Sequence, residues 1–171
     1  GDVNGDGYSD VVVGASGFDN GQLDEGRALV FLGRPGGLAP TPAWTAESNE
    51  PGAGFGSSAA SAGDVNGDGY SDVIVGAPLF DNDQTGEGRA FVYLGSATGL
   101  STVAGWTAES NQDAAAFGYS VASAGDVNGD GYSDVVVGAN AYTTSRGRAY
   151  IFFGAASMTT PDSTADVVLE N

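Results

Sequence analysis

One nine-residue segment occurs three times, and this repetition constrains the fold more than any other feature. The segment Asp-Val-Asn-Gly-Asp-Gly-Tyr-Ser-Asp begins at Asp2, Asp64 and Asp126, so the copies follow one another with a constant period of 62 residues. A fixed period of this size is typical of tandem structural units that each pack on their neighbours. The chain is therefore expected to consist of consecutive units with one shared structure.

Each unit also contains short apolar runs that are separated by Gly, Asn, Asp and Pro. No window shows the periodicity of a helix, and the runs are as short as strands. More polar runs begin at Trp44 and Trp106, and small residues dominate residues 55–60 and 117–122. The pattern predicts four strands per unit, of which the Val-rich ones are short and buried. The repeated apolar runs are residues 11–15, 73–77 and 135–139, followed by residues 26–33, 88–95 and 147–154.

A four-stranded unit repeated in tandem predicts the blade of a β-propeller, in which the small residues suit an inner strand crowded around the central channel. A β-sandwich would account for the strands but not for the strict period. The predicted fold class is all-β, with four-stranded antiparallel blades. The blades are residues 1–54, residues 55–116 and residues 117–171, and only the blade at 1–54 lacks its first strand. Propellers usually have about four to eight blades. Three blades form an incomplete ring, so the remaining blades are expected from the same longer chain or from further copies.

The second unit carries three short motifs in a fixed order. They are Phe55-Gly56, the nine-residue segment 64–72 and Gly76-Ala77-Pro78. This order resembles the FG-GAP repeat of the integrin α-subunit propeller and its bacterial relatives. Ser16 and Asn140 replace the proline in the first and third units, and the first unit has no Phe-Gly. The resemblance implies a β-propeller whose loops bind calcium and whose role is extracellular.

The nine-residue segments place oxygen ligands at alternating positions, as a Ca²⁺ loop requires. Side chains supply positions 1, 3, 5 and 9, the tyrosine backbone carbonyl supplies position 7, and glycine at position 6 permits the sharp turn. In the family that the chain resembles, the corresponding residues are the calcium ligands. Three Ca²⁺ sites are predicted. The candidate ligands are Asp2, Asn4, Asp6, Tyr8 and Asp10; Asp64, Asn66, Asp68, Tyr70 and Asp72; and Asp126, Asn128, Asp130, Tyr132 and Asp134.

Other interpretations of these loops are weaker. An EF-hand needs a bidentate Glu at position 12, where this chain has Val13, Val75 and Val137. Clusters of Asp, Asn and Gly also form turns without metal, but three copies with every ligand position kept favour calcium. Magnesium fits less well because it prefers octahedral geometry and retains several waters.

Composition excludes several classes of function. Asp and Glu number 22 against five basic residues, and the net charge of −17 argues against a nucleic-acid partner. No apolar run is long enough to insert into a membrane. Cys and His are absent, which excludes disulfides and thiol or imidazole catalysis. Calcium loops of extracellular modules bind weakly, with Kd on the order of 10⁻⁴ to 10⁻³ M, so a secreted or cell-surface location is expected.

The predicted function is that of a calcium-binding extracellular module for structure, adhesion or protein interaction, with no catalytic residues and a protein or glycan ligand. The alternative is a carbohydrate-binding propeller, or the accessory domain of a polysaccharide-active enzyme, in which Trp44 and Trp106 would stack on sugars. Packing between blades is the favoured role of these rings.

Two further features are expected to be structural or solvent-exposed. Arg27, Arg89 and Arg148 begin equivalent strands and are expected to pair with a neighbouring carboxylate. The acidic loops at residues 19–25 and 81–83 differ between units and are expected to lie in solvent.

Overall fold

The computed structural model describes residues 1–143, 146–158 and 164–170, and its regular elements are β-strands. No helix in these ranges has the length and apolar character needed to span a membrane. The strands are β1 (Val11–Ala15), β2 (Arg27–Phe31), β3 (Gly33–Arg34), β4 (Gly37–Leu38), β5 (Trp44–Glu47), β6 (Ser58–Gly63), β7 (Asp72–Ala77), β8 (Arg89–Tyr93), β9 (Trp106–Glu109), β10 (Phe117–Gly125), β11 (Asp134–Thr143), β12 (Arg146–Phe152) and β13 (Val167–Glu170).

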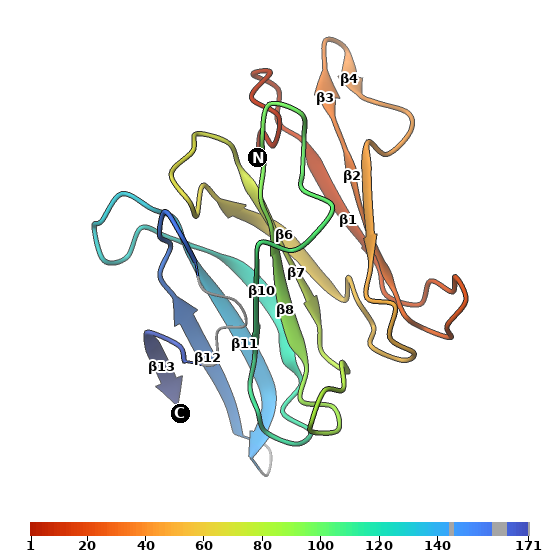
Figure 1. Cartoon of the computed structure of the whole chain (residues 1–171), viewed down its shortest axis with the longest axis vertical. Helices are drawn as coiled ribbons and strands as arrows, with labels where there is room; N and C mark the ends of the chain where they lie inside the picture. Colours follow the sequence, from red (N-terminus) through yellow and green to blue (C-terminus); the bar gives the residue numbers. More distant parts are fainter. Residues whose placement is uncertain (144–145, 159–163, 171) are drawn as a thin grey trace.

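Three antiparallel sheets account for most of these strands. The first sheet has the order β1-β2-β5, the second β6-β7-β8-β9 and the third β10-β11-β12-β13, while β3 and β4 form a separate hairpin. Figure 1 shows the three sheets following one another in chain order without closing into a ring. The predicted all-β architecture of four-stranded antiparallel propeller blades is confirmed.

The hydrophobic core lies between consecutive sheets. Val73 and Val75 of β7 belong to a cluster with Val30 and Trp44 of the first sheet. An equivalent cluster joins the second and third sheets and includes Trp106. Apolar side chains that alternate along a strand are thus buried on both faces of the second sheet, each face against a different neighbour.

The side-chain burial of β1 differs from the sequence prediction. Val11 and Val13 are 40% and 43% exposed, whereas the equivalent Val73 and Val75 are 3% and 0% exposed. The latter pack against the preceding sheet, and within the described residues no sheet covers the same face of β1. The prediction of a buried strand at residues 11–15 was therefore wrong, because burial here depends on a neighbouring sheet.

The two tryptophans link each sheet to the next one. Trp44 meets Tyr93 edge-on with ring centroids 4.8 Å apart, and Trp106 meets Phe152 in the same way at 4.9 Å. Trp44 also donates its indole N–H to the Ser101 carbonyl oxygen at 2.8 Å. Because Trp44 is 8% and Trp106 is 0% exposed, packing is their role and neither ring face is available to stack on a sugar.

Glycines permit the backbones of adjacent sheets to approach closely. A Cβ atom on Gly14 would lie 1.9 Å from the carbonyl oxygen of Gly56, and one on Gly76 would lie 2.0 Å from that of Gly118. Real Cβ atoms do not reach such distances from a backbone atom, so only glycine fits. The Gly-Ala of one unit and the Phe-Gly of the next therefore meet at each junction.

Candidate metal centres

The three nine-residue segments form loops of one conformation at one end of the sheets. The loop at residues 2–10 precedes β1, the loop at 64–72 joins β6 to β7, and the loop at 126–134 joins β10 to β11 (Figure 1). The position-6 glycines have left-handed backbone angles, with φ of 86°, 90° and 94° at Gly7, Gly69 and Gly131. This conformation strains residues with a Cβ atom, and it provides the predicted sharp turn.

The loop backbone winds around the carboxylate of position 1. Asp2 Oδ1 accepts hydrogen bonds from the N–H groups of Gly5 (2.8 Å) and Asp6 (3.2 Å), and Oδ2 accepts one from Gly7 (2.8 Å). Asp64 and Asp126 make the same contacts in their loops. Burial acts to raise the pKa of Asp2, but N–H donation, first from Gly7, holds that pKa below its ordinary value.

The side chains of positions 3 and 5 lie against each other on the exposed side of the loop. Asn4 donates its amide N–H to Asp6 Oδ2 at 3.0 Å, and Asn4 Oδ1 accepts from the Asp6 backbone at 3.1 Å. Asp6 Oδ1 accepts from the N–H of Tyr8 at 2.9 Å. Asn66 with Asp68 and Asn128 with Asp130 repeat this arrangement. The structure thus brings positions 1, 3 and 5 of each loop together.

Position 9 ties the loop to its own sheet. Asp72 Oδ2 accepts from the Val65 N–H at 2.7 Å, and its Oδ1 accepts from the Gly95 N–H at 2.8 Å. Burial raises the pKa of Asp72 to about 6, with a smaller increase from the charges of Asp68 and Asp64. The same two contacts are made by Asp10 with Val3 and Gly33, and by Asp134 with Val127 and Gly154. This structural role of position 9 was not predicted from the sequence.

Asp72→Asn is expected to remove a pH dependence of stability in the absence of metal. Burial raises the folded-state pKa of Asp72 to about 6, so the unaltered chain should lose up to about 3 kcal/mol of unfolding free energy as the pH rises from about 4 to about 7, and an amide does not ionise. Chemical denaturation without metal at these pH values measures the loss. Asp10→Asn is the matched control: Asp10 makes the same contacts but is only partly buried, so this variant should keep most of the pH dependence. An equal reduction in the two variants would contradict the role given to burial.

The donor atoms of each loop fit a hard cation in type. Within the described part of the chain, no three Asp, Glu, His or Cys side chains converge as a ready metal cluster, since position 9 is directed at backbone N–H groups. Carboxylate, amide and carbonyl oxygens are nevertheless the ligands that Ca²⁺ takes, and a carboxylate oxygen that accepts one hydrogen bond keeps a free lone pair. The predicted ligand set therefore stays a prediction.

Consecutive loops are hydrogen-bonded to each other. The Ser71 N–H donates to the Asp2 carbonyl oxygen at 2.9 Å, and the Ser133 N–H donates to that of Asp64 at 2.8 Å. A Cβ atom on Gly5 would lie 2.7 Å from the ring of Tyr70, so the tyrosine of one loop covers the glycine of the loop before it. Order in one loop is thereby coupled to order in the next.

Comparison with known proteins places this geometry in a family. The FG-GAP repeat profile matches residues 1–31, 55–93 and 117–152, which is more than half of the chain. The chain belongs to the FG-GAP repeat family. The resemblance stated from the motifs is confirmed.

Integrin alpha chains are among the relatives. Integrin alpha-7 of Rattus norvegicus is 37% identical over 149 residues, covering 86% of this chain. Integrin alpha-IIb of Mus musculus is 36% identical over 145 residues, covering 81%, and integrin alpha-5 of Xenopus laevis is 32% identical over 173 residues, covering 94%. This FG-GAP chain spans 13%, 14% and 16% of the lengths of these three relatives.

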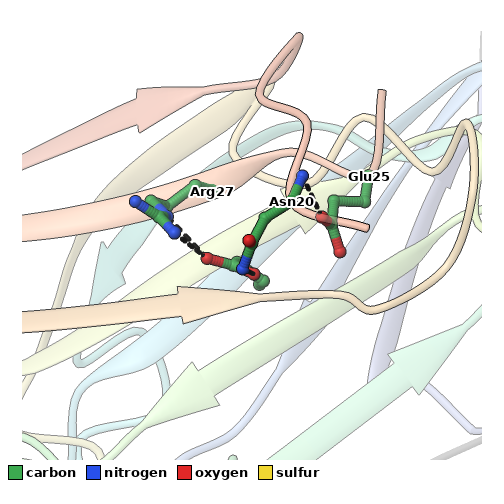
Figure 2. Close-up of polar contacts among 4 residues, drawn as sticks. Asn20, Glu25 and Arg27 are labelled. Atoms are coloured by element: carbon green, nitrogen blue, oxygen red, sulfur yellow. Dashed lines mark hydrogen bonds and ion pairs between the residues drawn. The ribbon is translucent and has the colours of Figure 1, made fainter. Parts of the chain in front are cut away.

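The arginine at the equivalent position of β2, β8 and β12 forms the predicted ion pair in each FG-GAP unit. Arg27 donates through Nε to Glu47 Oε1 at 2.6 Å (Figure 2), and Arg89 lies 2.8 Å from Glu109. Arg148 pairs with Glu170. Each guanidinium also stacks on an aromatic ring, at 3.6 Å from the Phe18 centroid, 4.2 Å from that of Phe80 and 3.7 Å from that of Tyr142.

The acidic loop at residues 19–25 is less exposed than predicted. Glu25 is 0% exposed, and its Oε1 accepts from the Asn20 N–H at 2.6 Å (Figure 2). Its carbonyl oxygen accepts from the N–H of Phe55 in the next FG-GAP unit at 3.1 Å. Glu25 is thus held inside a sheet junction, whereas residues 19–24 and 81–83 are exposed or partly exposed, as expected of loops in solvent.

Proposed function

We propose that this chain is a calcium-stabilised propeller segment that acts as an extracellular structural, adhesion or protein-interaction module, without catalysis of its own. Its blades are residues 1–54, 55–116 and 117–171. The observation that carries the proposal is that three loops of identical donor content are hydrogen-bonded in series across the sheet junctions. The similarity to integrin alpha chains supports a protein ligand and a place at the cell surface.

Calcium would be held by the oxygen ligands predicted for positions 1, 3, 5, 7 and 9 of each loop. When bound, the ion supplies positive charge beside three carboxylates that otherwise repel one another. In the second loop, for example, the charges of Asp64 and Asp68 already raise the pKa of Asp72. Because the loops are linked, a bound ion would also support the junction between sheets, so its role is structural rather than that of a sensor.

Further blades would complete the propeller. The face of β1 that carries Val11 and Val13 is exposed, whereas the corresponding face of β7 is covered by another sheet. At the other side of the array, a Cβ atom on Gly138 would meet no backbone of a following unit, unlike one on Gly14 or Gly76. We propose that blades from the same longer chain, or from further copies, cover these two surfaces.

Equilibrium dialysis of the chain against radioactive calcium tests the proposal. We expect three ions per chain at saturation in the millimolar range, with weaker binding of magnesium. Asp2→Asn, Asp64→Asn and Asp126→Asn should each remove one ion, because position 1 lies at the centre of its loop. Asp83→Asn, in an exposed loop, is the control and should keep all three. Absence of saturable calcium binding up to about 10 mM would overturn the proposal.

A further inference from the structure

Two glutamates of the second unit, Glu87 in the loop before β8 and Glu109 at the end of β9, lie buried beside each other near the junction of the second and third sheets. Glu87 is 0% and Glu109 is 9% exposed. Glu87 Oε1 accepts from the Asn82 N–H at 3.1 Å, and Glu109 Oε1 accepts from Arg89 at 2.8 Å and from the Asn82 amide at 3.3 Å. The Oε2 atoms of both glutamates are buried without a hydrogen-bond partner among the described residues.

The surroundings supply too little positive charge for two ionised carboxylates. Arg89 is the cation on β8, and its guanidinium already pairs with Glu109 and stacks on a ring. β10, which packs here through Phe117, carries no charged side chain. The adjoining loops contribute further acids at Asp81, Asp83 and Asp113. One surplus negative charge would therefore be enclosed where water cannot screen it.

The titration of Glu87 agrees with this charge count. Burial raises the pKa of Glu87, and the charge of Glu109 raises it further. When one of the two carboxyl groups is protonated, it can donate a hydrogen bond to the other, which adds to the increase, while N–H donation from Asn82 and Gln84 opposes it.

We propose that Glu87 and Glu109 share one proton in the folded chain, and that this proton makes the junction between the second and third sheets sensitive to pH. The connection to the junction is direct. The Glu87 carbonyl oxygen accepts from the Phe117 N–H of the third sheet at 2.9 Å and from the Ser110 hydroxyl at 3.0 Å. Loss of the proton leaves both carboxylates charged and enclosed. One of them belongs to Glu87, whose carbonyl oxygen binds the Phe117 N–H.

The first sheet contains an internal comparison. Glu25 and Glu47 occupy the equivalent positions, but the Asn20 amide donates to Glu47 Oε2 at 2.9 Å, and Arg27 donates to its Oε1 (Figure 2). The hydrogen bond from Asn20 is the largest effect and lowers the pKa of Glu47; burial, the next in size, acts to raise it, and the hydrogen bond and charge of Arg27 lower it further. Both oxygens of Glu47 are satisfied in the ionised state. The junction between the first and second sheets should therefore lack the proton-sharing pair.

Urea unfolding of the whole chain and of its Glu87→Gln variant from pH 4 to pH 9, in saturating calcium, tests the proposal. A raised folded-state pKa stabilises the fold below the unfolded-state pKa of about 4.3, and this stability is lost as the pH rises through the folded-state value. Between the two pKa values, the unfolding constant of the unaltered chain should rise relative to that of the variant by up to about tenfold per pH unit. Glu25→Gln is the matched control and should show no such trend.

A ratio of unfolding constants that stays constant with pH would overturn the proposal. So would a ratio that follows the concentration of sodium or calcium at fixed pH, because a cation rather than a proton would then hold the pair. Carbon-13 NMR of the glutamate carboxyl carbons in the unaltered chain gives a second measurement that does not depend on the folding of a variant. One glutamate should titrate above all others; its absence would also contradict the shared proton.

Discussion

Gly76→Ala is expected to lower the free energy of unfolding by about 3 kcal/mol, near the upper end of what overpacking costs. The added Cβ atom would lie 2.0 Å from the Gly118 carbonyl oxygen of the next sheet and 2.9 Å from its carbonyl carbon. These are backbone atoms, so they cannot rotate away as a side chain can. The sheets must instead move apart, which loosens the core that surrounds Phe117.

Gly138→Ala is the matched control within the same chain. An added Cβ atom would lie 2.4 Å from the Ser58 hydroxyl oxygen at Gly76, and 2.4 Å from the Ser120 hydroxyl oxygen at Gly138. At Gly138, however, no backbone carbonyl lies within 3.4 Å of the added atom. A serine hydroxyl can turn to another rotamer, so we expect a loss below about 1 kcal/mol there. Denaturation midpoints of the two variants measure the contrast, and similar losses would refute the assignment of Gly76 to a backbone junction.

Removing calcium is expected to have the largest effect on stability. For Kd values of about 10⁻⁴ to 10⁻³ M, 10 mM calcium stabilises the folded state by about 1.4–2.7 kcal/mol per site, or about 4–8 kcal/mol for three sites. In a chain of this size such a change corresponds to a melting-temperature shift on the order of 10–20 °C. Calorimetry with 10 mM calcium and with EDTA, at matched ionic strength, measures it.

The variants at position 1 make the calcium experiment specific. Asp2→Asn, Asp64→Asn and Asp126→Asn should each lose about one third of the calcium-dependent shift, and magnesium should restore little of it. A general salt effect would act equally on all variants. Superimposable melting curves with calcium and with EDTA would exclude a stabilising role for the loops.

The sequence predicts the strands and loops well because they depend on local chemistry that repeats. The sharp turn of each loop is specified by the glycine at position 6 itself, and the strand at residues 73–77 is specified by its own run of apolar residues. The burial of residues 11–15 could not be predicted in the same way, because the equivalent valines of β7 are covered by a different sheet and not by their own unit.

The unpredicted parts of the candidate sites also depend on distant partners. Asp72 accepts a hydrogen bond from Gly95, which lies 23 residues further along the chain. Glu87, in the loop before β8, is enclosed by Glu109 at the end of β9 and by Phe117 of another unit. Spacing within a motif cannot show such contacts. One sequence signal does distinguish Glu25 and Glu87 from the other acids. A Glu precedes Gly-Arg-Ala in the first two units, whereas Arg146 takes this position in the third.

The meeting of Gly-Ala with Phe-Gly gives every junction the same two complementary sides. Each sheet presents one kind of surface to the sheet before it and another to the sheet after it, so the contact is head-to-tail. Duplication of one unit within a gene would therefore create a junction that already fits, and deletion of an internal unit would leave its two neighbours able to meet. An assembly of this kind can change length by whole units during evolution without the prior appearance of a new interface.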